Sequence, residues 1–412
     1  MNVCSIEWVV CLLALSALFF LIPGVRLKQM LLFACSASFV ASFVPNTAGW
    51  IALAAFVGVG YLAATLLQQF PRKIILVLYL AILLSAFIVF KQYAFARVLL
   101  PAVLFQRIIA TVGWSYMLFR QIHVAVDAYE GQIDSLSFWN YLNYQLNVFG
   151  FVAGPIQRYQ DFCRCWMDLA PILSDAESIL RAYLRIFIGV VKIALLGQVC
   201  LDLFSSCSNL LNDAVQAGHE TQGMRLLQFL AMFYCYPLYI YFNFSGYCDM
   251  VIAGASLFGL KMPENFDRPY LSRNMIDYWT RFHRTLGFWI RDYIFTPMYK
   301  GVAARWPARA ASLAFLCYLV AFTLAGIWHG HGWNFVIFGL LNGLGAAAAK
   351  LWETRLVKRF GRQGLRSYLQ DPRIRAAAIV GTVNFACFTI FFFPSDLKRS
   401  FHIVRNVFAA RL

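Results

Sequence analysis

Charged residues are scarce in this sequence: they make up 13% of its 412 residues, about half the share of a typical soluble domain. Acidic residues are the scarcest, with 19 Asp+Glu against 35 Lys+Arg. So little polar surface cannot cover a water-exposed globule, which excludes two or three ordinary soluble domains. Hydrophobic residues supply 61% of the chain and the mean hydropathy is +0.65, so disorder is excluded as well. The composition predicts an all-α polytopic membrane protein.

The net charge is +16, which in a soluble protein would suggest nucleic acid. Here the basic residues stand between apolar runs, as they do in cytoplasmic loops beside anionic lipid. We therefore predict membrane lipid, and no nucleic acid, as a partner. The eleven cysteines scatter mostly through apolar stretches and indicate no disulfide framework. Cys163 and Cys165 form a lone C-x-C pair, for which free thiols are a more frequent explanation than a metal site.

Apolar runs close to the ~20 residues that cross a bilayer recur along the chain. They lie at 6–22, 30–45, 50–68, 74–93, 178–204, 310–328, 332–350 and 375–393. The first of these is expected to be a retained span, because no basic residue precedes it. Residues 224–260 are long enough for two helices, broken around Pro237 and Gly246. We predict about ten or eleven transmembrane helices in a single integral-membrane domain over 1–412.

Less regular segments lie at 98–128, at 136–170, which Gly154-Pro155 interrupts, and at 274–293. Their amphipathic, aromatic character suits interfacial or re-entrant helices. A basic loop is expected at 350–375, with eight Lys/Arg and two acids, and the positive-inside rule predicts that it is cytoplasmic. The chain shows no internal repeat, Walker P-loop or dinucleotide fingerprint.

The first cluster of polar residues is His329 and His331, between two apolar runs and beside Gly326, Gly330 and Gly332. Glycine permits a break between helices and close approach of a ligand, and histidine can accept a proton near neutral pH. A satisfied histidine that caps a helix is an equally frequent explanation. A catalytic zinc would need a third ligand, and none lies nearby in sequence, so we predict no metal.

A second cluster holds His283 among aromatic residues, with Asp277 and Arg281 spaced to pair on a helix. It also suits an interfacial aromatic belt. A third cluster holds Asn243, Ser245 and Asp249. A buried carboxylate needs a partner, and we expect Arg281, Arg291 or His283 to supply it for Asp249.

In these clusters the sequence resembles the membrane-bound O-acyltransferase family, closest to its bacterial polysaccharide branch, which serves alginate O-acetylation and teichoic-acid D-alanylation. The ordered motifs that carry the resemblance are Ala153-Gly-Pro-Ile-Gln-Arg158, Tyr241-Phe-Asn-Phe-Ser-Gly-Tyr-Cys-Asp-Met250, Pro263-Glu-Asn-Phe266, Pro269-Tyr-Leu-Ser-Arg273, Trp279-Thr-Arg-Phe-His283, Trp289-Ile-Arg-Asp-Tyr293 and Gly326-Ile-Trp-His-Gly330. The motif-bearing core is 110–345, flanked by N-terminal spans in 1–100 and a C-terminal span and tail in 375–412.

The resemblance implies an acyltransferase of the bacterial inner membrane, with its helices around a central tunnel. It would move a short acyl group, acetyl by preference, from a cytoplasmic thioester to a hydroxyl for modification of an extracytoplasmic polysaccharide. No cofactor would stay bound; the donor substrate would be acetyl-CoA or an acyl-carrier protein, and a partner acyltransferase would pass the group onward. The motif places the catalytic role on His329 rather than His331, with His283 orienting the acyl group or stabilising the oxyanion. The predicted substrate-binding residues are Asn243, Ser245, Asp249, Arg281, Trp328, Trp333 and Asn334.

Two alternatives stay open at this point. One is a lipid or protein O-acyltransferase of the same family. The other is a proton-coupled transporter, in which His and Asp within spans relay protons. A transporter would be expected to show internal repeats, and it should release no free thiol from acetyl-CoA.

Overall fold

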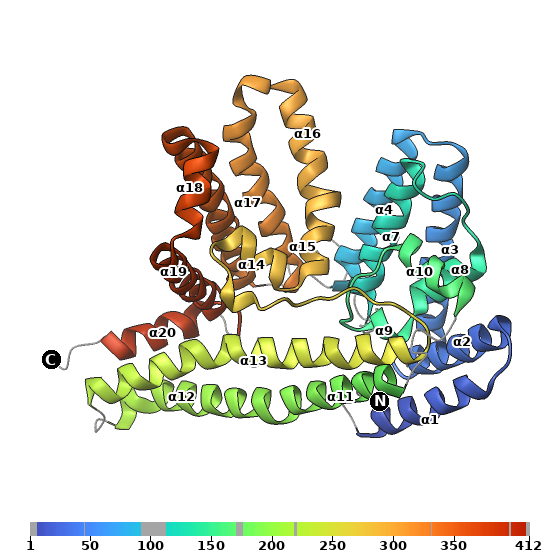
Figure 1. Cartoon of the computed structure of the whole chain (residues 1–412), viewed down its shortest axis with the longest axis horizontal. Coiled ribbons are helices and arrows are strands. Elements are labelled where there is room, and N and C mark those ends of the chain that lie inside the picture. Colours follow the sequence, from blue (N-terminus) through green and yellow to red (C-terminus); the bar gives the residue numbers. More distant parts are fainter. Residues whose placement is uncertain are drawn as a thin grey trace. The chain divides into compact units, whose positions relative to one another are not determined.

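The computed structural model describes residues 6–44, 46–91, 113–169, 176–217, 221–330, 332–394 and 397–408. Within these ranges the chain is almost entirely helical (Figure 1), with one isolated antiparallel bridge and no strand. A helix satisfies its own backbone N–H and C=O groups, which a bilayer requires because it offers no water to bond them. The predicted all-α class is confirmed.

The chain divides into two compact units, each described by itself. The first comprises residues 1–190 and 247–264, and the second comprises 191–246 and 265–412.

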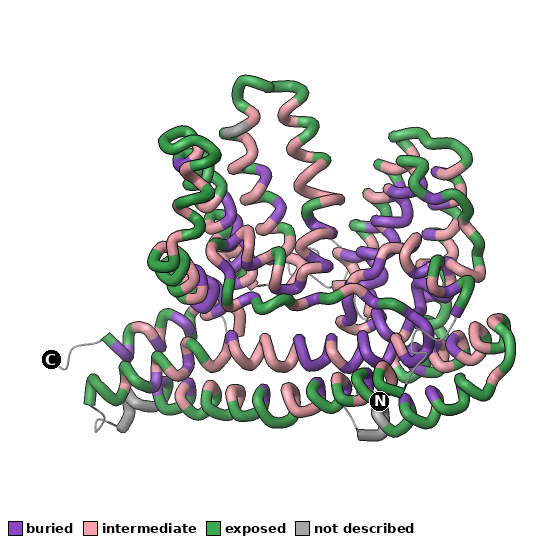
Figure 2. The backbone as a smooth tube through the Cα atoms, viewed as in Figure 1, coloured by how far each residue is buried: buried purple, intermediate pink, exposed green. Residues whose placement is uncertain are grey.

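The first unit contains a run of apolar helices followed by short amphipathic ones. Its helices are α1 (Ile6–Leu21), α2 (Val25–Ala41), α3 (Thr47–Gln69), α4 (Lys73–Lys91), α7 (Trp114–Tyr129), α8 (Phe138–Leu146), α9 (Val148–Phe151), α10 (Tyr159–Asp168) and α11 (Ala176–Val191). Helix α7 packs against both α3 and α4 (Figure 1) and is buried along most of its length (Figure 2). The break expected at Gly154-Pro155 falls between α9 and α10.

The second unit contains most of the motif-bearing segments. Its elements are η1 (Lys192–Gly197), α12 (Gln198–Ala217), α13 (Gln222–Leu257), whose last turns belong to the first unit, η2 (Pro269–Leu271), α14 (Met275–Arg281), α15 (Arg284–Ile290), η3 (Arg291–Phe295), α16 (Thr296–Arg305), η4 (Pro307–Arg309), α17 (Ala310–His329), α18 (Trp333–Gln370), α19 (Pro372–Phe391) and α20 (Leu397–Phe408).

Helices α17 and α18 form the most extensive helix pair in this unit. A Cβ atom on Gly326 would lie 2.3 Å from the carbonyl oxygen of Phe335, and one on Gly339 would lie 2.5 Å from that of Phe322. Only glycine fits where two backbones approach so closely, and small residues commonly serve this purpose between membrane helices. The two glycines therefore hold the ends of α17 and α18 together around His329.

Five helical segments of the described chain are long and apolar enough to cross a membrane: 47–69, 176–212, 312–329, 333–370 and 372–391. Two shorter apolar segments lie at 10–21 and 73–89. A multi-pass membrane protein is confirmed, while the count of ten or eleven spans stays a prediction.

Two expectations about breaks are wrong. Helix α13 runs unbroken from Gln222 to Leu257 with Pro237 inside it, because one missing N–H does not by itself end a long helix that tertiary packing supports. The basic segment 350–375 is helical rather than a loop: α18 continues to Gln370, with non-helical dihedrals only at Gly361. Lys, Arg, Leu and Gln are good helix formers, so the positive charge of this segment does not end the helix.

Candidate active site

His329 is the last residue of α17, and α18 begins four residues later at Trp333. The predicted break between two apolar helices is therefore confirmed, although His331 lies outside the described residues. The half-buried imidazole of His329 is surrounded by aromatic rings. Its centroid lies 4.7 Å from the ring of Trp328, 5.2 Å from Phe393 and 5.9 Å from Phe338.

His283 lies between α14 and α15 and is buried. Its backbone is left-handed, with φ 48° and ψ 49°, a conformation that costs energy for a residue with a Cβ atom. A short antiparallel pairing holds it there. The backbone N–H of Asp267 donates to the carbonyl of Arg281 at 2.9 Å, and that of Arg284 donates to the carbonyl of Asn265 at 3.0 Å.

The side chain of Asn265 fixes the protonation of His283. Its Oδ1 accepts from the backbone N–H of Thr285 at 3.2 Å and from the Thr285 hydroxyl at 2.9 Å, and it lies 3.2 Å from Nδ1 of His283. A backbone N–H can only donate, so the amide atom facing it is the oxygen. Nδ1 of His283 must then carry the hydrogen, and Nε2 carries the lone pair.

His283 lies outside the helices that could span the membrane. Burial and, to a smaller extent, repulsion from His329 together lower the pKa of His283 to about 3. Its imidazole is therefore neutral at neutral pH. Gly287, whose N–H donates to the carbonyl of His283 at 3.1 Å, lines one cavity together with His329, so the two predicted catalytic histidines lie in one neighbourhood of the second unit.

A cavity of about 180 Å³ opens beside these residues, among α14, α15, η3, α17 and α18. Its walls are mostly apolar, and His329 and Asn342 are among its few polar groups. Nε1 of Trp279 donates to Oδ1 of Asn342 at 3.1 Å, which ties α14 to α18 across the cavity. An apolar cavity with a few convergent polar groups is the usual form of a small-molecule site.

The predicted substrate-binding residues divide by position. Arg281 pairs with Asp277 at 2.7 Å, as its helical spacing predicts. Trp333 is 75% exposed and does not line the cavity. Asn334 is buried at the start of α18, and Trp328 packs on His329. Half-buried Asn243 and buried Ser245 lie on α13.

The expected partner of Asp249 is wrong. Within the first unit, Asp249 pairs with Nε of Arg185 at 2.9 Å, and the same guanidinium holds both carboxylate oxygens of Glu264 at 2.7 Å. Two of the expected partners are engaged elsewhere: Arg281 by the acid one turn before it, and Arg291 by its neighbour Asp292. Asp249 therefore joins α13 to α11, an arrangement that suggests structural support.

Two asparagines of the site, Asn265 and Asn342, were not predicted from the sequence. Asn265 stands inside the motif Pro263-Glu-Asn-Phe266, but its side chain is short and neutral and gives no sign of a functional role in the sequence. Asn342 is a polar residue inside an apolar span, and that signal could have found it.

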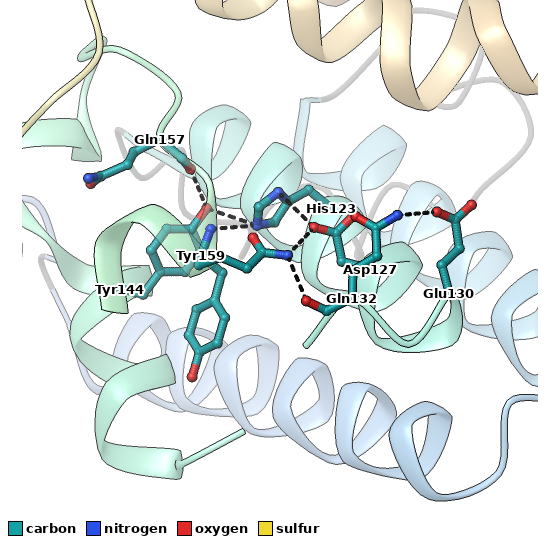
Figure 3. Close-up of polar contacts among 8 residues, drawn as sticks. His123, Asp127, Glu130, Gln132, Tyr144, Gln157 and Tyr159 are labelled. Carbon is teal, nitrogen blue, oxygen red and sulfur yellow. Dashed lines mark hydrogen bonds and ion pairs between the residues drawn. The ribbon is translucent and has the colours of Figure 1, made fainter. Parts of the chain in front are cut away.

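A second buried histidine, His123 on α7, belongs to a polar network in the first unit (Figure 3). Its Nε2 accepts the backbone N–H of Tyr159 at 2.9 Å, and the Tyr144 hydroxyl lies 3.4 Å away. Its Nδ1 faces Asp127 Oδ2 at 3.9 Å. Helix α7 is not among the candidate membrane spans. Burial lowers the pKa of His123 to about 4, although the negative charge of Asp127 raises it in part. The bond from the backbone of Tyr159 engages Nε2, so His123 anchors the start of α10.

Comparisons with known proteins agree with the motifs. The model of the MBOAT, membrane-bound O-acyltransferase family, matches residues 56–391. Over 298 residues the chain is 25% identical to the teichoic acid D-alanyltransferase of Streptococcus thermophilus, which covers 71% of this chain and 70% of that protein. It is 26% identical to the peptidoglycan O-acetyltransferase of Helicobacter pylori (66% of this chain, 47% of that one). It is 29% identical to the probable alginate O-acetylase AlgI of Pseudomonas putida (58% and 45%).

Proposed function

The chain belongs to the membrane-bound O-acyltransferase family, as its motifs predict, and from this premise we propose that it moves a short acyl group, acetyl by preference, from a thioester donor to a hydroxyl. The relatives' names specify teichoic acid, peptidoglycan and alginate. We carry a polysaccharide acceptor over to this chain on that ground. The donor, acetyl-CoA or an acyl-carrier protein on the cytoplasmic side, the onward partner acyltransferase and the bacterial inner membrane belong to the same proposal.

The observation that carries the proposal is the apolar cavity with His329 in its wall and His283 nearby. His329 accepts the proton of the acceptor hydroxyl as the oxygen attacks the thioester carbonyl. A C–O bond forms, the tetrahedral intermediate collapses, and the C–S bond breaks. The proton held on His329 passes to the leaving sulfur, so the histidine returns to its neutral state.

His283 has a different part in this scheme. Because Asn265 keeps the hydrogen on Nδ1, Nε2 of His283 can accept a hydrogen bond but cannot donate one. A neutral acceptor suits the orientation of a hydroxyl, or of the ring of His329, better than the stabilisation of an oxyanion. Asn265 is then a positioning residue, which sets the tautomer without touching substrate.

The test is acyl transfer from a labelled acetyl donor in membranes that contain the wild-type chain or His329→Ala. We expect label in a polysaccharide only with the wild type. Label in lipid or protein would favour the lipid or protein O-acyltransferase alternative. A purified protein that releases no free thiol from any acyl thioester, with or without acceptor, would contradict acyl transfer and favour a transporter.

A further inference from the structure

A second cavity in the second unit, of about 460 Å³, lies among the starts of α14 and α19 and the later part of α18. We call it the basic groove. Its floor is apolar, formed by Ile276, Ala349, Leu356 and Ala378. None of its lining residues lines the cavity of His329 except Ile276 and Thr280.

Two arginines, Arg273 and Arg375, line the basic groove. Among the residues that the structure describes, no carboxylate lies within ion-pair distance of either. Nη1 of Arg273 donates to the carbonyl of Leu369 at 3.2 Å, which points this side chain along α18. The two cations therefore have charge left to offer a ligand.

Two carboxylates also line the groove, and each has a basic partner of its own. Asp277 pairs with Arg281 at 2.7 Å, and Glu353 pairs with Lys350 at 2.9 Å. With these four charges cancelled in pairs, the groove keeps the two positive charges of its arginines. The rest of the segment 350–375 adds to them, because apart from Lys350, Arg375 and Glu353 it holds six Lys/Arg and one acid.

The position of the groove along the helices places it at a membrane surface. Twenty residues of helix span about 30 Å, the thickness of the hydrocarbon core. Counted from Trp333, the span of α18 ends near Trp352, which is half exposed at the groove. The next candidate span, 372–391, begins beside it, because Ile374 and Arg375 line the same groove as Trp352. The aromatic rings of Trp352 and Tyr368 suit the headgroup level of a bilayer.

We propose that the basic groove binds the headgroup of an anionic glycerophospholipid, with its phosphate between Arg273 and Arg375. Basic pockets between membrane helices recognise such headgroups. The apolar floor and the exposed Trp352 continue onto the lipid-facing side of the spans, where the glycerol and the first acyl carbons would lie. A soluble phosphate would leave that apolar surface unused. The proposal does not rest on acyl transfer, because neither arginine lines the cavity of His329.

The experiment measures binding of dioctanoyl phosphatidylglycerol to the detergent-purified protein by native mass spectrometry. We expect Arg273→Gln/Arg375→Gln to weaken binding about 25-fold, near fivefold for each arginine. Dioctanoyl phosphatidylcholine should bind the wild type far more weakly, and sn-glycero-3-phosphate should not compete. The matched control is Lys358→Gln/Arg366→Gln, which removes equal charge from the same segment outside the groove and should change the affinity by less than twofold.

Equal weakening in the control pair would mean diffuse attraction to the basic segment, and would overturn the proposal. Competition by sn-glycero-3-phosphate or CoA at similar concentration would identify a soluble phosphate ligand instead. If the double variant folds poorly, Arg375→Gln alone decides the matter, because this exposed side chain makes no hydrogen bond or ion pair within the described residues that the substitution would remove. It should weaken phosphatidylglycerol about fivefold, and unchanged affinity would refute the site.

Discussion

Asn265→Asp tests whether this side chain tunes His283 or only packs against it. The substitution keeps an oxygen for the three donors that converge on Oδ1, and it adds a negative charge about 3 Å from Nδ1 of His283. A carboxylate at that distance raises the pKa of a histidine by roughly 1–3 units. From the wild-type pKa of about 3, the histidine would move to a pKa of about 4–6.

The direction of the effect on activity follows from the sign of that shift. A raised pKa means that the imidazolium forms at higher pH, and the imidazolium has no lone pair on Nε2. Activity that needs this lone pair is then lost sooner as the pH falls. We expect the acid limb of the kcat profile of Asn265→Asp to move toward neutral pH, measured as acetyl transfer between pH 4.5 and 8.

Two further variants separate tuning from packing. Asn265→Ala leaves buried donors unsatisfied, at about 1–3 kcal/mol each, and frees the tautomer, so kcat per folded molecule should fall by about 10²-fold or more. Thr285→Val removes the hydroxyl that donates to Oδ1 of Asn265 but leaves the contact between that oxygen and Nδ1 of His283 in place. This variant should therefore lower the melting temperature without moving the acid limb of the kcat profile. An Asn265→Asp enzyme whose pH profile matches the wild type would refute the positioning role.

Three other perturbations test the site, the fold and the topology. His329→Ala should lower acyl transfer by about 10²–10⁴-fold at normal expression, and His331→Ala should have a milder effect. The double variant His283→Ala/His329→Ala should be no less active than the poorer single variant, because the losses of residues that act as a unit do not add. The pKa of His123 is lower in the folded protein, so the free energy of unfolding should fall as the pH drops from about 6.5 toward 4, by up to about 1.4 kcal/mol per pH unit. His123→Gln keeps an acceptor for the backbone N–H but does not titrate, so its melting temperature should depend less on pH in this range. A cysteine at exposed Gln363, in a background cleared of accessible thiols, should resist an impermeant thiol reagent in intact cells, and labelling without lysis would overturn a cytoplasmic location for 350–375.

Sequence patterns predicted those features of the structure that depend on residues close together in the chain. The break at His329 follows from glycines between two apolar runs, and the pairing of Asp277 with Arg281 follows from helical spacing. The partner of Asp249 could not be found this way, because Arg185 stands 64 residues upstream on another helix. The continuity of α13 through Pro237 was also out of reach, since a proline marks a weak point but tertiary packing decides whether the helix ends.

The two buried histidines show where sequence reasoning stops. His123 and His283 are the same residue type, both are almost fully buried, and burial lowers the pKa of both. What separates them is which ring nitrogen is engaged in a hydrogen bond, with the backbone in His123 and with a side-chain amide in His283. In His123 the N–H of Tyr159 occupies Nε2, so that ring is an anchor. In His283 the amide of Asn265 occupies Nδ1, so the far nitrogen keeps its lone pair for chemistry. That choice depends on a turn and an asparagine 18 residues away, and no pattern around either histidine records it.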